Sequence, residues 1–452
     1  MVQTISISDD ASSRPTVMPT DQRPWVFPLV VLTAVYTFNS VDRLIFNVLA
    51  EQIKQDLNLK DWHLGVLTGL SFSLIYALAS LPIARFAERT HRPRLIACAL
   101  VVWSSFTIAC SFARSFGTLA AARLGVGLGE SAFSPAAYSL VADTVPAQRR
   151  SFAFGVFYSA MPIGTLIAMA IGGVIADQWG WRAALPLAGV PGLLLAPVLW
   201  WMVKDPRYSV AAAMQQPARD FRADVRALWR KRSFILLVVA QGLYSVTGYG
   251  TLAFVTSFYL RNHVGSLDTL ATIINGRLGT DLAQVGVLGP VLGILGGLAG
   301  IFGAIASGAI TDRLVRRDPR HFGFMGAIPQ IIAFPLFVGT LFTPYLGVSL
   351  FLLTVYLIFQ AMPGPAFWSA VQGLSPVETR ATATALSLFT IVLVGNGFGP
   401  LLIGAASDLM VGLAGNAGSA LRWALIVGQI PAFIAMACFL LSRRHLRGDF
   451  ID

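Results

Sequence analysis

The feature that most constrains the fold of this chain is an internal repeat. Residues 84–89 (ARFAER) end an apolar run, and residues 308–313 (GAITDR) end another one in the second part of the chain. Residues 135–149 (PAAYSLVADTVPAQR) return as 365–380 (PAFWSAVQGLSPVETR) at a similar offset. A long repeat in an apolar chain is typical of two homologous membrane halves around a central pathway, so it predicts a transporter.

The composition agrees with a membrane protein. Of the 452 residues, 55% are hydrophobic and only 12% are charged, and the mean hydropathy is +0.68. Soluble domains carry about 25% charged residues. Runs of about 20 apolar residues, the length that crosses a bilayer, occur at 26–50, 63–84, 95–112, 117–141, 151–175 and 183–203, and again at 233–261, 283–311, 322–342, 346–371, 381–408 and 421–442. We therefore expect an all-α membrane protein with twelve transmembrane helices in two pseudo-symmetric six-helix halves.

The arginines indicate the orientation. Those that follow the even-numbered runs are Arg85, Arg89, Arg92 and Arg94, then Arg149 and Arg150, then Arg313, Arg316, Arg317 and Arg320, and finally Arg443, Arg444 and Arg447. The other loops carry few, so the positive-inside rule places both termini in the cytoplasm. The net charge of +11 is then a topology signal and gives no reason to expect nucleic-acid binding.

The runs divide the chain into five parts. These are a cytoplasmic tail (1–25), a first half (26–203), a cytoplasmic linker (204–232), a second half (233–442) and a second cytoplasmic tail (443–452). Residues 217–230 of the linker carry apolar and basic side chains on opposite helical faces, which predicts a helix on the inner membrane surface. The long outer segment 262–282 has no assigned role.

Four ionisable residues interrupt the apolar runs of the first half: Asp42, Arg43, Arg123 and Glu130. Each would cost about 2.5–3.5 kcal/mol at the centre of a lipid-facing helix, or roughly 10 kcal/mol together. They must therefore face a polar cavity and pair with one another. At about 1.5 Å of rise per residue, their depths allow the pairs Asp42–Arg123 and Arg43–Glu130. These could be static bridges, but buried ion pairs stabilise a fold only weakly, which favours a functional role.

Charged residues at the ends of the runs suggest two gates. The expected cytoplasmic gate consists of Glu88, Arg89, Arg149, Asp312, Arg313 and Arg380, and the external gate consists of Asp177, Arg182, Asp408 and Arg422. In the second half, the spans offer polar and aromatic side chains in place of charges: Tyr244, Tyr249, Gln360, Phe367, Trp368 and Asn396. A charged half that faces an aromatic half would suit an amphipathic substrate with a charged head and an apolar tail.

The quoted motifs resemble the major facilitator superfamily over residues 26–445. The segment after the second run is similar to its G-x-x-x-D-R-x-G-R-[RK] signature, with Ala84, Glu88, His91 and Pro93 as departures, and Gly308 to Arg313 is a closer copy. Three stretches resemble the spinster family of lipid transporters: 41–43 (VDR), 123–130 (RLGVGLGE) and 157–164 (FYSAMPIG).

The spinster resemblance implies a proton-driven or proton-sensitive transporter of lysolipids or sphingoid phosphates. It makes Asp42 the proton-sensing acid, with Arg43 and Glu130 as its switching partners. A bacterial member of the family, monomeric in the inner membrane, fits best.

Two other functions compete with lipid transport. A membrane enzyme is not favoured, because the five histidines are scattered, no metal or haem ligand set is apparent and no ATP-binding loop occurs. We expect no cofactor. A proton-coupled carrier of small organic anions is the main alternative, since Arg43 and Arg123 could bind a carboxylate as well as a phosphate.

Overall fold

The computed structural model describes residues 25–146, 150–206, 221–376 and 379–450, and within these ranges the chain is helical and forms no strand. Eleven described helices are long and apolar enough to cross a membrane. The remaining crossing, residues 116–144, is interrupted at Ser131 and Ala132 and is therefore two shorter helices. The predicted fold class, twelve spans in two six-helix halves, is confirmed.

The first half contains nine α-helices and one π-helical turn within the described residues. They are α1 (Val26–Asp56), α2 (Asp61–Gly65), the π-helical turn η1 (Val66–Leu70), α3 (Ser71–Arg89), α4 (Arg92–Cys110), α5 (Phe116–Glu130), α6 (Phe133–Thr144), α7 (Arg150–Tyr158), α8 (Ala160–Trp179) and α9 (Trp181–Met202). The pairs α5/α6 and α7/α8 and the series α2/η1/α3 each form one span. Ser115 caps α5 by accepting the Thr118 N–H, which fixes where the charged fourth span begins.

The second half repeats this arrangement. Its spans are α11 (Arg232–Asn262), α13 (Gln284–Val315), α14 (His321–Phe342), α15 (Leu346–Ala361) with α16 (Pro363–Leu374), α17 (Arg380–Thr390) with the π-helical turn η5 (Ile391–Phe398) and α18 (Gly399–Ala414), and α19 (Ala417–Val427) with α20 (Ile430–Asp449). Helix α1 extends past the predicted end at residue 50, and α20 extends past residue 442.

Two further helices lie outside the spans. The linker contains α10 (Phe221–Trp229), in which Leu228 is buried while Arg226 and Trp229 are exposed; the rest of the predicted helix, 217–220, lies outside the described residues. The outer segment 262–282 forms α12 (Val264–Leu278), which ends at Gly279 with a φ of 66°. Glycine adopts this left-handed conformation at little cost.

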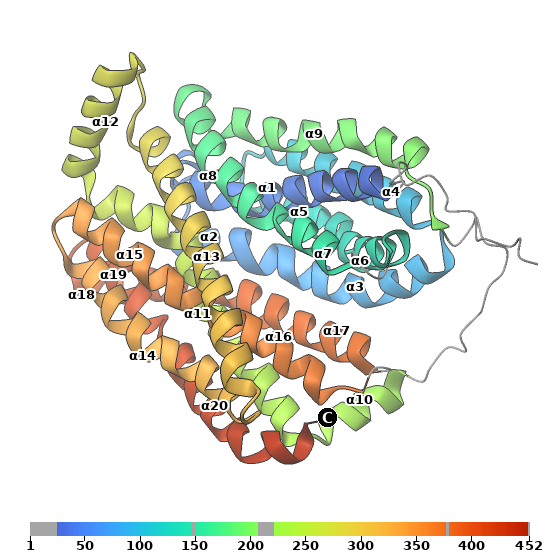
Figure 1. Ribbon diagram of the computed structural model, residues 1–452. Helices are drawn as coiled ribbons and strands as arrows, with labels where there is room; N and C mark the ends of the chain where they lie inside the picture. The colour runs from blue at the N-terminus through green and yellow to red at the C-terminus, as the bar shows by residue number, and fades with distance from the viewer. Residues whose placement is uncertain (1–24, 147–149, 207–220, 377–378, 451–452) are drawn as a thin grey trace, which may run out of the picture.

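The halves meet at one end of the bundle. In Figure 1 they converge where α2, α18 and α19 lie, which we call the closed end, and diverge toward α10 and the C-terminus, which we call the linker end. At the closed end a single buried cluster joins both halves, because Ala50, Leu64 and Met169 pack with Phe254 and Leu288. Toward the linker end the buried clusters belong almost entirely to one half each.

Small residues allow the helices of the two halves to approach closely. Helix α8 packs along α13, and a Cβ atom at Gly289 would lie 2.2 Å from the backbone oxygen of Met169. Such contacts between glycines and backbone atoms are typical of helix packing in membranes. The closed end therefore depends on the absence of side chains at these positions.

We predict that Gly289→Ala raises the population open at the closed end about tenfold, because overpacking costs roughly 1–3 kcal/mol. The measurement is the distance between spin labels at Trp179 and Leu278, which are 69% and 70% exposed. Gly300→Ala is the matched control, since a Cβ there meets nothing within 4 Å. Equal distances in the two variants would contradict this packing argument.

Candidate functional site

Arg43 of α1 and Glu130 of α5 form an ion pair inside the first half. Arg43 Nε lies 2.5 Å from Glu130 Oε2; the Glu130 side chain is 0% exposed, and that of Arg43 is 29% exposed. The guanidinium also lies 5.0 Å from the ring centre of Phe72 and 4.9 Å from that of Tyr76, within the range of cation–π attraction. The structure thus brings together one of the two pairs suggested by depth, and leaves part of Arg43 accessible.

The second suggested pair, Asp42–Arg123, is not formed. Both side chains are buried, with 1% relative exposure, but neither oxygen of Asp42 has a hydrogen-bond partner among the described residues. Arg123 Nε donates instead to the backbone oxygen of Leu67 at 3.1 Å. Its guanidinium lies 4.2 Å from the ring centre of Phe46. The expectation was wrong because the depth comparison did not consider a backbone carbonyl as a competing acceptor.

The carboxyl group of Asp42 nevertheless lies in a polar environment. Arg123 and Glu130 act on it electrostatically from α5, and the side chains of Trp103 and Thr107 face it from α4. The Trp103 Nε1 and Thr107 Oγ1 atoms are buried without hydrogen-bond partners in the described structure. Asp42 therefore has neighbours that can respond to its charge, but no partner that fixes the charge.

One residue of the second half lies near Arg43. Tyr249 of α11 lies close enough to interact electrostatically with Arg43 and Tyr76. Four of the predicted cavity residues are half-buried, and these are Tyr249, Gln360, Trp368 and Asn396. They remain candidates to contact a substrate.

Two predicted cavity residues belong to the packed interior of the second half. Tyr244 is 4% exposed and donates its hydroxyl hydrogen toward Gln360, with oxygen atoms at 2.8 and 2.9 Å. Phe367 is 2% exposed and packs within a buried cluster. For these two the cavity assignment is corrected: the hydroxyl needs a partner inside the protein, and the phenylalanine ring fills the core.

Two aspartates of the predicted external gate bind the opposite half through its backbone. Asp408 of α18 accepts the N–H groups of Asp61 and Trp62, at 3.0 and 2.7 Å, where α2 begins. Asp177 of α8 accepts the N–H of Ala283 at 2.6 Å, immediately before α13. Each lies on the fifth span of its half and binds the start of the second span of the other. A carboxylate at a helix N-terminus is favourable because it accepts free N–H groups and opposes the helix dipole.

The two arginines of the predicted external gate bind within their own halves. Arg182 binds Asp56, with 2.5 Å between Nη1 and Oδ2. Arg422 donates to Asn262 at 3.0 Å. In this conformation the contacts that this gate makes between the halves therefore come from its aspartates, and the gate as a set of four residues stays a prediction.

The sequence analysis missed an ion cluster at the closed end. Arg261 of α11 binds Asp61 at 2.7 Å and Glu51 at 2.8 Å, both from the first half. Lys54 adds a contact of 2.6 Å to Asp61, and Ser407 of α18 donates to the same carboxylate. The acidic residues of the loop after the first span were a signal, but their partner lies about 200 positions away in the sequence.

The structure describes only part of the predicted cytoplasmic gate at the linker end. The side chains of Glu88, Arg89 and Arg149 lie outside the described residues. Asp312, Arg313 and Arg380 are exposed, and Arg380 Nε donates to the Ser375 oxygen within its own half.

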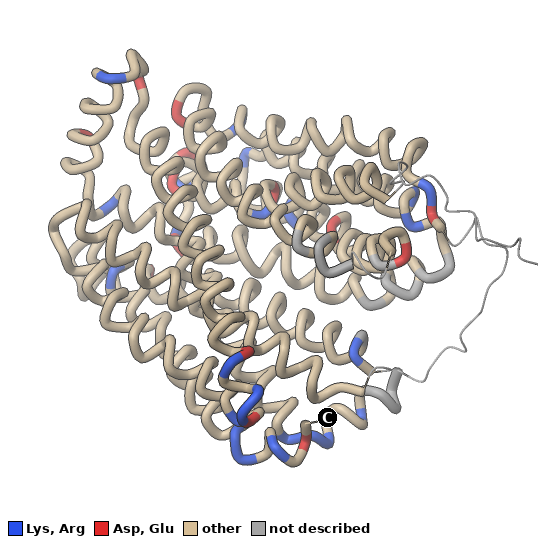
Figure 2. The backbone as a smooth tube through the Cα atoms, viewed as in Figure 1, with Lys and Arg blue, Asp and Glu red and all other residues tan. Residues whose placement is uncertain are grey.

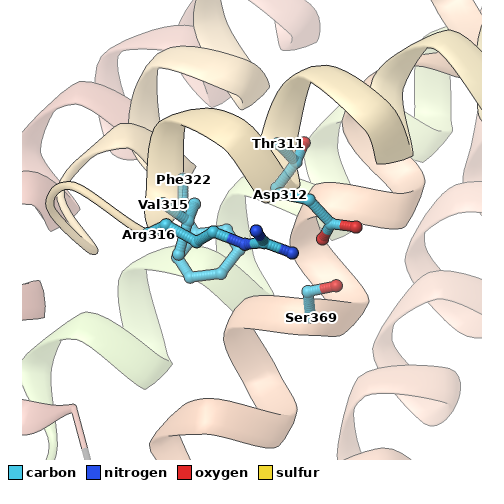
Figure 3. Close-up of a pocket in the computed structure, with 6 residues that line it drawn as sticks. All are labelled: Thr311, Asp312, Val315, Arg316, Phe322 and Ser369. Carbon is cyan, nitrogen blue, oxygen red and sulfur yellow. The ribbon is translucent and has the colours of Figure 1, made fainter.

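Basic residues gather at the linker end of the second half, between α13 and α14 and near the end of α20, as Figure 2 shows. Asp312 and Arg316 extend into a small cavity of about 270 Å³ that also borders Ser369 (Figure 3). Among the residues that the structure describes at this end, no ion pair joins the two halves, in contrast to the closed end.

No group of three or more His, Cys, Asp or Glu side chains that could hold a metal ion occurs among the described residues. At the junction of α11 and α12, burial and the nearby Arg422 cation lower the pKa of His263. This histidine, which lies outside the spans, therefore stays neutral near pH 7. The chemistry of the site is that of carboxylates, arginines and aromatic rings.

Comparison with known proteins identifies the class. The family model of the Major Facilitator Superfamily matches residues 32–400, and the chain belongs to this superfamily of membrane transporters. An "MFS-type efflux pump" of Mycolicibacterium smegmatis is 30% identical over 95% of each chain.

Relatives with more specific names also occur. "Protein spinster" of Drosophila melanogaster is 25% identical over 85% of this chain and 62% of its own length. A "Gallate transporter" of Pseudomonas putida is 26% identical over 94% of each chain. The crystal structure of a bacterial homologue of the human lysosomal transporter spinster, inward-facing and unoccupied, superposes with a TM-score of 0.82 at 23% identity, covering 96% of this chain and 100% of that one. The predicted resemblance to spinster proteins is confirmed.

We predict that Asp177→Ala and Asp408→Ala each favour opening of the closed end about fivefold, because losing a helix cap costs roughly 1 kcal/mol. The two contacts are far apart, so their effects should add in the double variant. The controls Arg182→Gln and Arg422→Gln should leave the spin-label distance unchanged, since both arginines bind within one half. A larger effect of the arginine variants would show that the arginines, and not the aspartates, hold this end closed.

Proposed function

We propose that the protein is a proton-coupled transporter of an amphipathic lipid with an anionic head group, of the lysophospholipid or sphingoid phosphate type. The observation that carries this proposal is that only one of the two expected ion pairs is formed. Arg43 is paired with Glu130 and remains 29% exposed, whereas Asp42 is buried with no hydrogen-bond partner among the described residues.

The proton has a physical role in this arrangement. A buried carboxylate that makes no close hydrogen bond is costly as an anion and much less so as the neutral acid. With Asp42 protonated, the arginines are free to bind other acceptors, and Arg43 pairs with Glu130. Loss of the proton gives Asp42 a negative charge that attracts an arginine and resets the carrier. The conformational cycle would thus be coupled to a proton.

The substrate class follows from the two sides of the pathway. The accessible part of Arg43 can bind a phosphate or carboxylate, while Trp368 and Tyr249 present aromatic surface to a tail. The spinster relatives support a lipid, among them a "Probable sphingolipid transporter" of Arabidopsis thaliana that is 30% identical over 34% of this chain. The gallate transporter supports the alternative, a proton-coupled carrier of small organic anions.

We further place the linker end and both termini in the cytoplasm, with the protein a monomer in a bacterial inner membrane. The basic residues at the linker end support this orientation under the positive-inside rule. On this assignment the present conformation opens inward. The gate of Glu88, Arg89, Arg149, Asp312, Arg313 and Arg380 would form only when the linker end closes.

We predict that proteoliposomes containing the protein transport a lysophospholipid faster when a pH gradient is imposed, and that Asp42→Asn abolishes this dependence. The substituted amide mimics the protonated acid and cannot release a proton. Glu130→Gln should slow transport at every pH, because it removes the partner of Arg43. A folded Asp42→Asn protein with the wild-type pH profile would show that Asp42 is only structural.

We predict that Trp368→Ala weakens binding of long-chain lysolipids at least tenfold and of short-chain analogues much less. The indole is expected to bury tail surface, which contributes roughly 25 cal/mol per Å². Binding can be measured by competition at fixed head group and varied chain length. Equal losses for both lengths would favour the carrier of small anions.

A further inference from the structure

The second span contains an irregular turn, η1 (Val66–Leu70), between α2 and α3. In a regular α-helix the N–H of Ser71 would donate to the oxygen of Leu67, four residues earlier. Here it donates to the oxygen of Val66, five residues earlier. The turn therefore deprives the Leu67 carbonyl of its usual donor, and a carbonyl inside a membrane protein is costly without one.

Two side chains supply the missing donors. Arg123 Nε lies 3.1 Å from the Leu67 oxygen, and the hydroxyl oxygen of Ser71 lies 3.3 Å from it. Arg123 is buried, and this is the one hydrogen bond recorded for its side chain in the described structure, where Nη1 has no partner. Arg123, which was expected to pair with Asp42, therefore stabilises an irregular backbone turn.

The turn lies on the contact surface between the halves. A Cβ at Gly65 would lie 2.4 Å from the oxygen of Pro400, and a Cβ at Gly69 would lie 2.5 Å from that of Asn396. η1 thus packs against α18 and against η5, itself a π-helical turn. One turn earlier, α2 begins at the N–H groups held by Asp408. The shape of η1 therefore sets how the closed end fits together.

Arg123 has competing acceptors nearby. It interacts electrostatically with Asp42 and Glu130, and also with Cys110 and Arg43. Glu130 is already paired with Arg43, so Asp42 is the remaining acid. The groups that act on Asp42 are Glu130 and Arg123 from α5, and Trp103, Thr107 and Cys110 from α4.

We propose that Arg123 is a positioning residue that couples the charge of Asp42 to the closed end by holding the π-helical turn η1. This rests on the proposed function, since the switch is the proton on Asp42. With Asp42 neutral, Arg123 stays on the Leu67 carbonyl and the closed end remains assembled.

With Asp42 ionised, Arg123 moves to its carboxylate, and the N–H of Ser71 returns to Leu67. The hydrogen bonds of the turn then reach four residues back in place of five, while the number of residues stays the same. This change rotates α2 by about 100° relative to α3. That rotation takes the starting N–H groups of α2 away from Asp408 and opens the closed end.

The test measures the distance between spin labels at Lys60 and Leu413 in detergent-purified protein at several pH values. Both positions are exposed at the closed end; Cys98 and Cys438 are replaced by serine, while Cys110, which is buried, is kept. In the parent protein the separated population should increase with pH.

Deleting Thr68 removes the extra residue, so the second span becomes a regular helix while α2 keeps its present orientation. This variant has no turn left to convert and should give close labels at every pH. Arg123→Gln can still donate to Leu67 but cannot follow the charge of Asp42, so it should also give close labels at every pH.

Two milder substitutions test the same idea in case the variants above fail to fold. The shift of the first should be opposite to that of the Thr68 deletion, which is not expected of residues that merely stabilise the fold. Ser71→Ala removes the second donor to Leu67 and should raise the separated population about threefold, as expected for one hydrogen bond. Ser73→Ala is the matched control, because its buried hydroxyl has no hydrogen-bond partner in the described structure. Wild-type profiles in both the Thr68 deletion and Ser71→Ala would overturn the proposal.

The same measurements separate this inference from the proposed function. If the parent distance and the lipid flux are both independent of pH, proton coupling is wrong. The comparison of Ser71→Ala with Ser73→Ala then still decides whether the turn holds the closed end. If flux responds to pH but the turn variants do not alter the distance between the labels, the proposed transport function is retained and the role of η1 is rejected.

Discussion

The cost of ionised groups within the membrane is the constraint on which the rest of this structure depends. Four charged side chains in the first half could not be left in lipid, where each costs several kcal/mol. They lie instead inside the protein, where Asp42, Arg123 and Glu130 are buried and Arg43, which is 29% exposed, neutralises Glu130. The half must therefore pack around them, and its second span is bent into a π-helical turn whose freed carbonyl engages Arg123.

A similar cost applies to backbone N–H groups without a hydrogen-bond partner at the closed end. The first N–H groups of a helix lack partners within it, and the two contacts from Asp177 and Asp408 supply partners from the opposite half. Each contact is present only while the halves are together at that end. Backbone groups that must be bonded in any helical protein thus become part of the interface between the halves.

The two halves share an architecture but differ in chemistry. The first holds the membrane-centre charges, and the second offers Tyr249, Gln360, Trp368 and Asn396 at half-buried positions. This asymmetry underlies the proposed division of roles, in which the first half carries the coupling proton and the second half shapes the cavity. The fold alone does not decide the substrate, because the same fold serves many.

The sequence by itself determined the membrane location, the repeat and the twelve spans, because apolar length and charge patterning act locally along the chain. It also indicated the pairing of Arg43 with Glu130, since depth in the membrane follows from helical rise. Only the tertiary structure decided that Arg123 binds the Leu67 carbonyl, that Asp177 and Asp408 bind helix starts, and that Arg261 joins Glu51 and Asp61. Each of these contacts depends on which of several acceptors lies within about 3 Å, and that distance is set by the packing of helices far apart in the sequence.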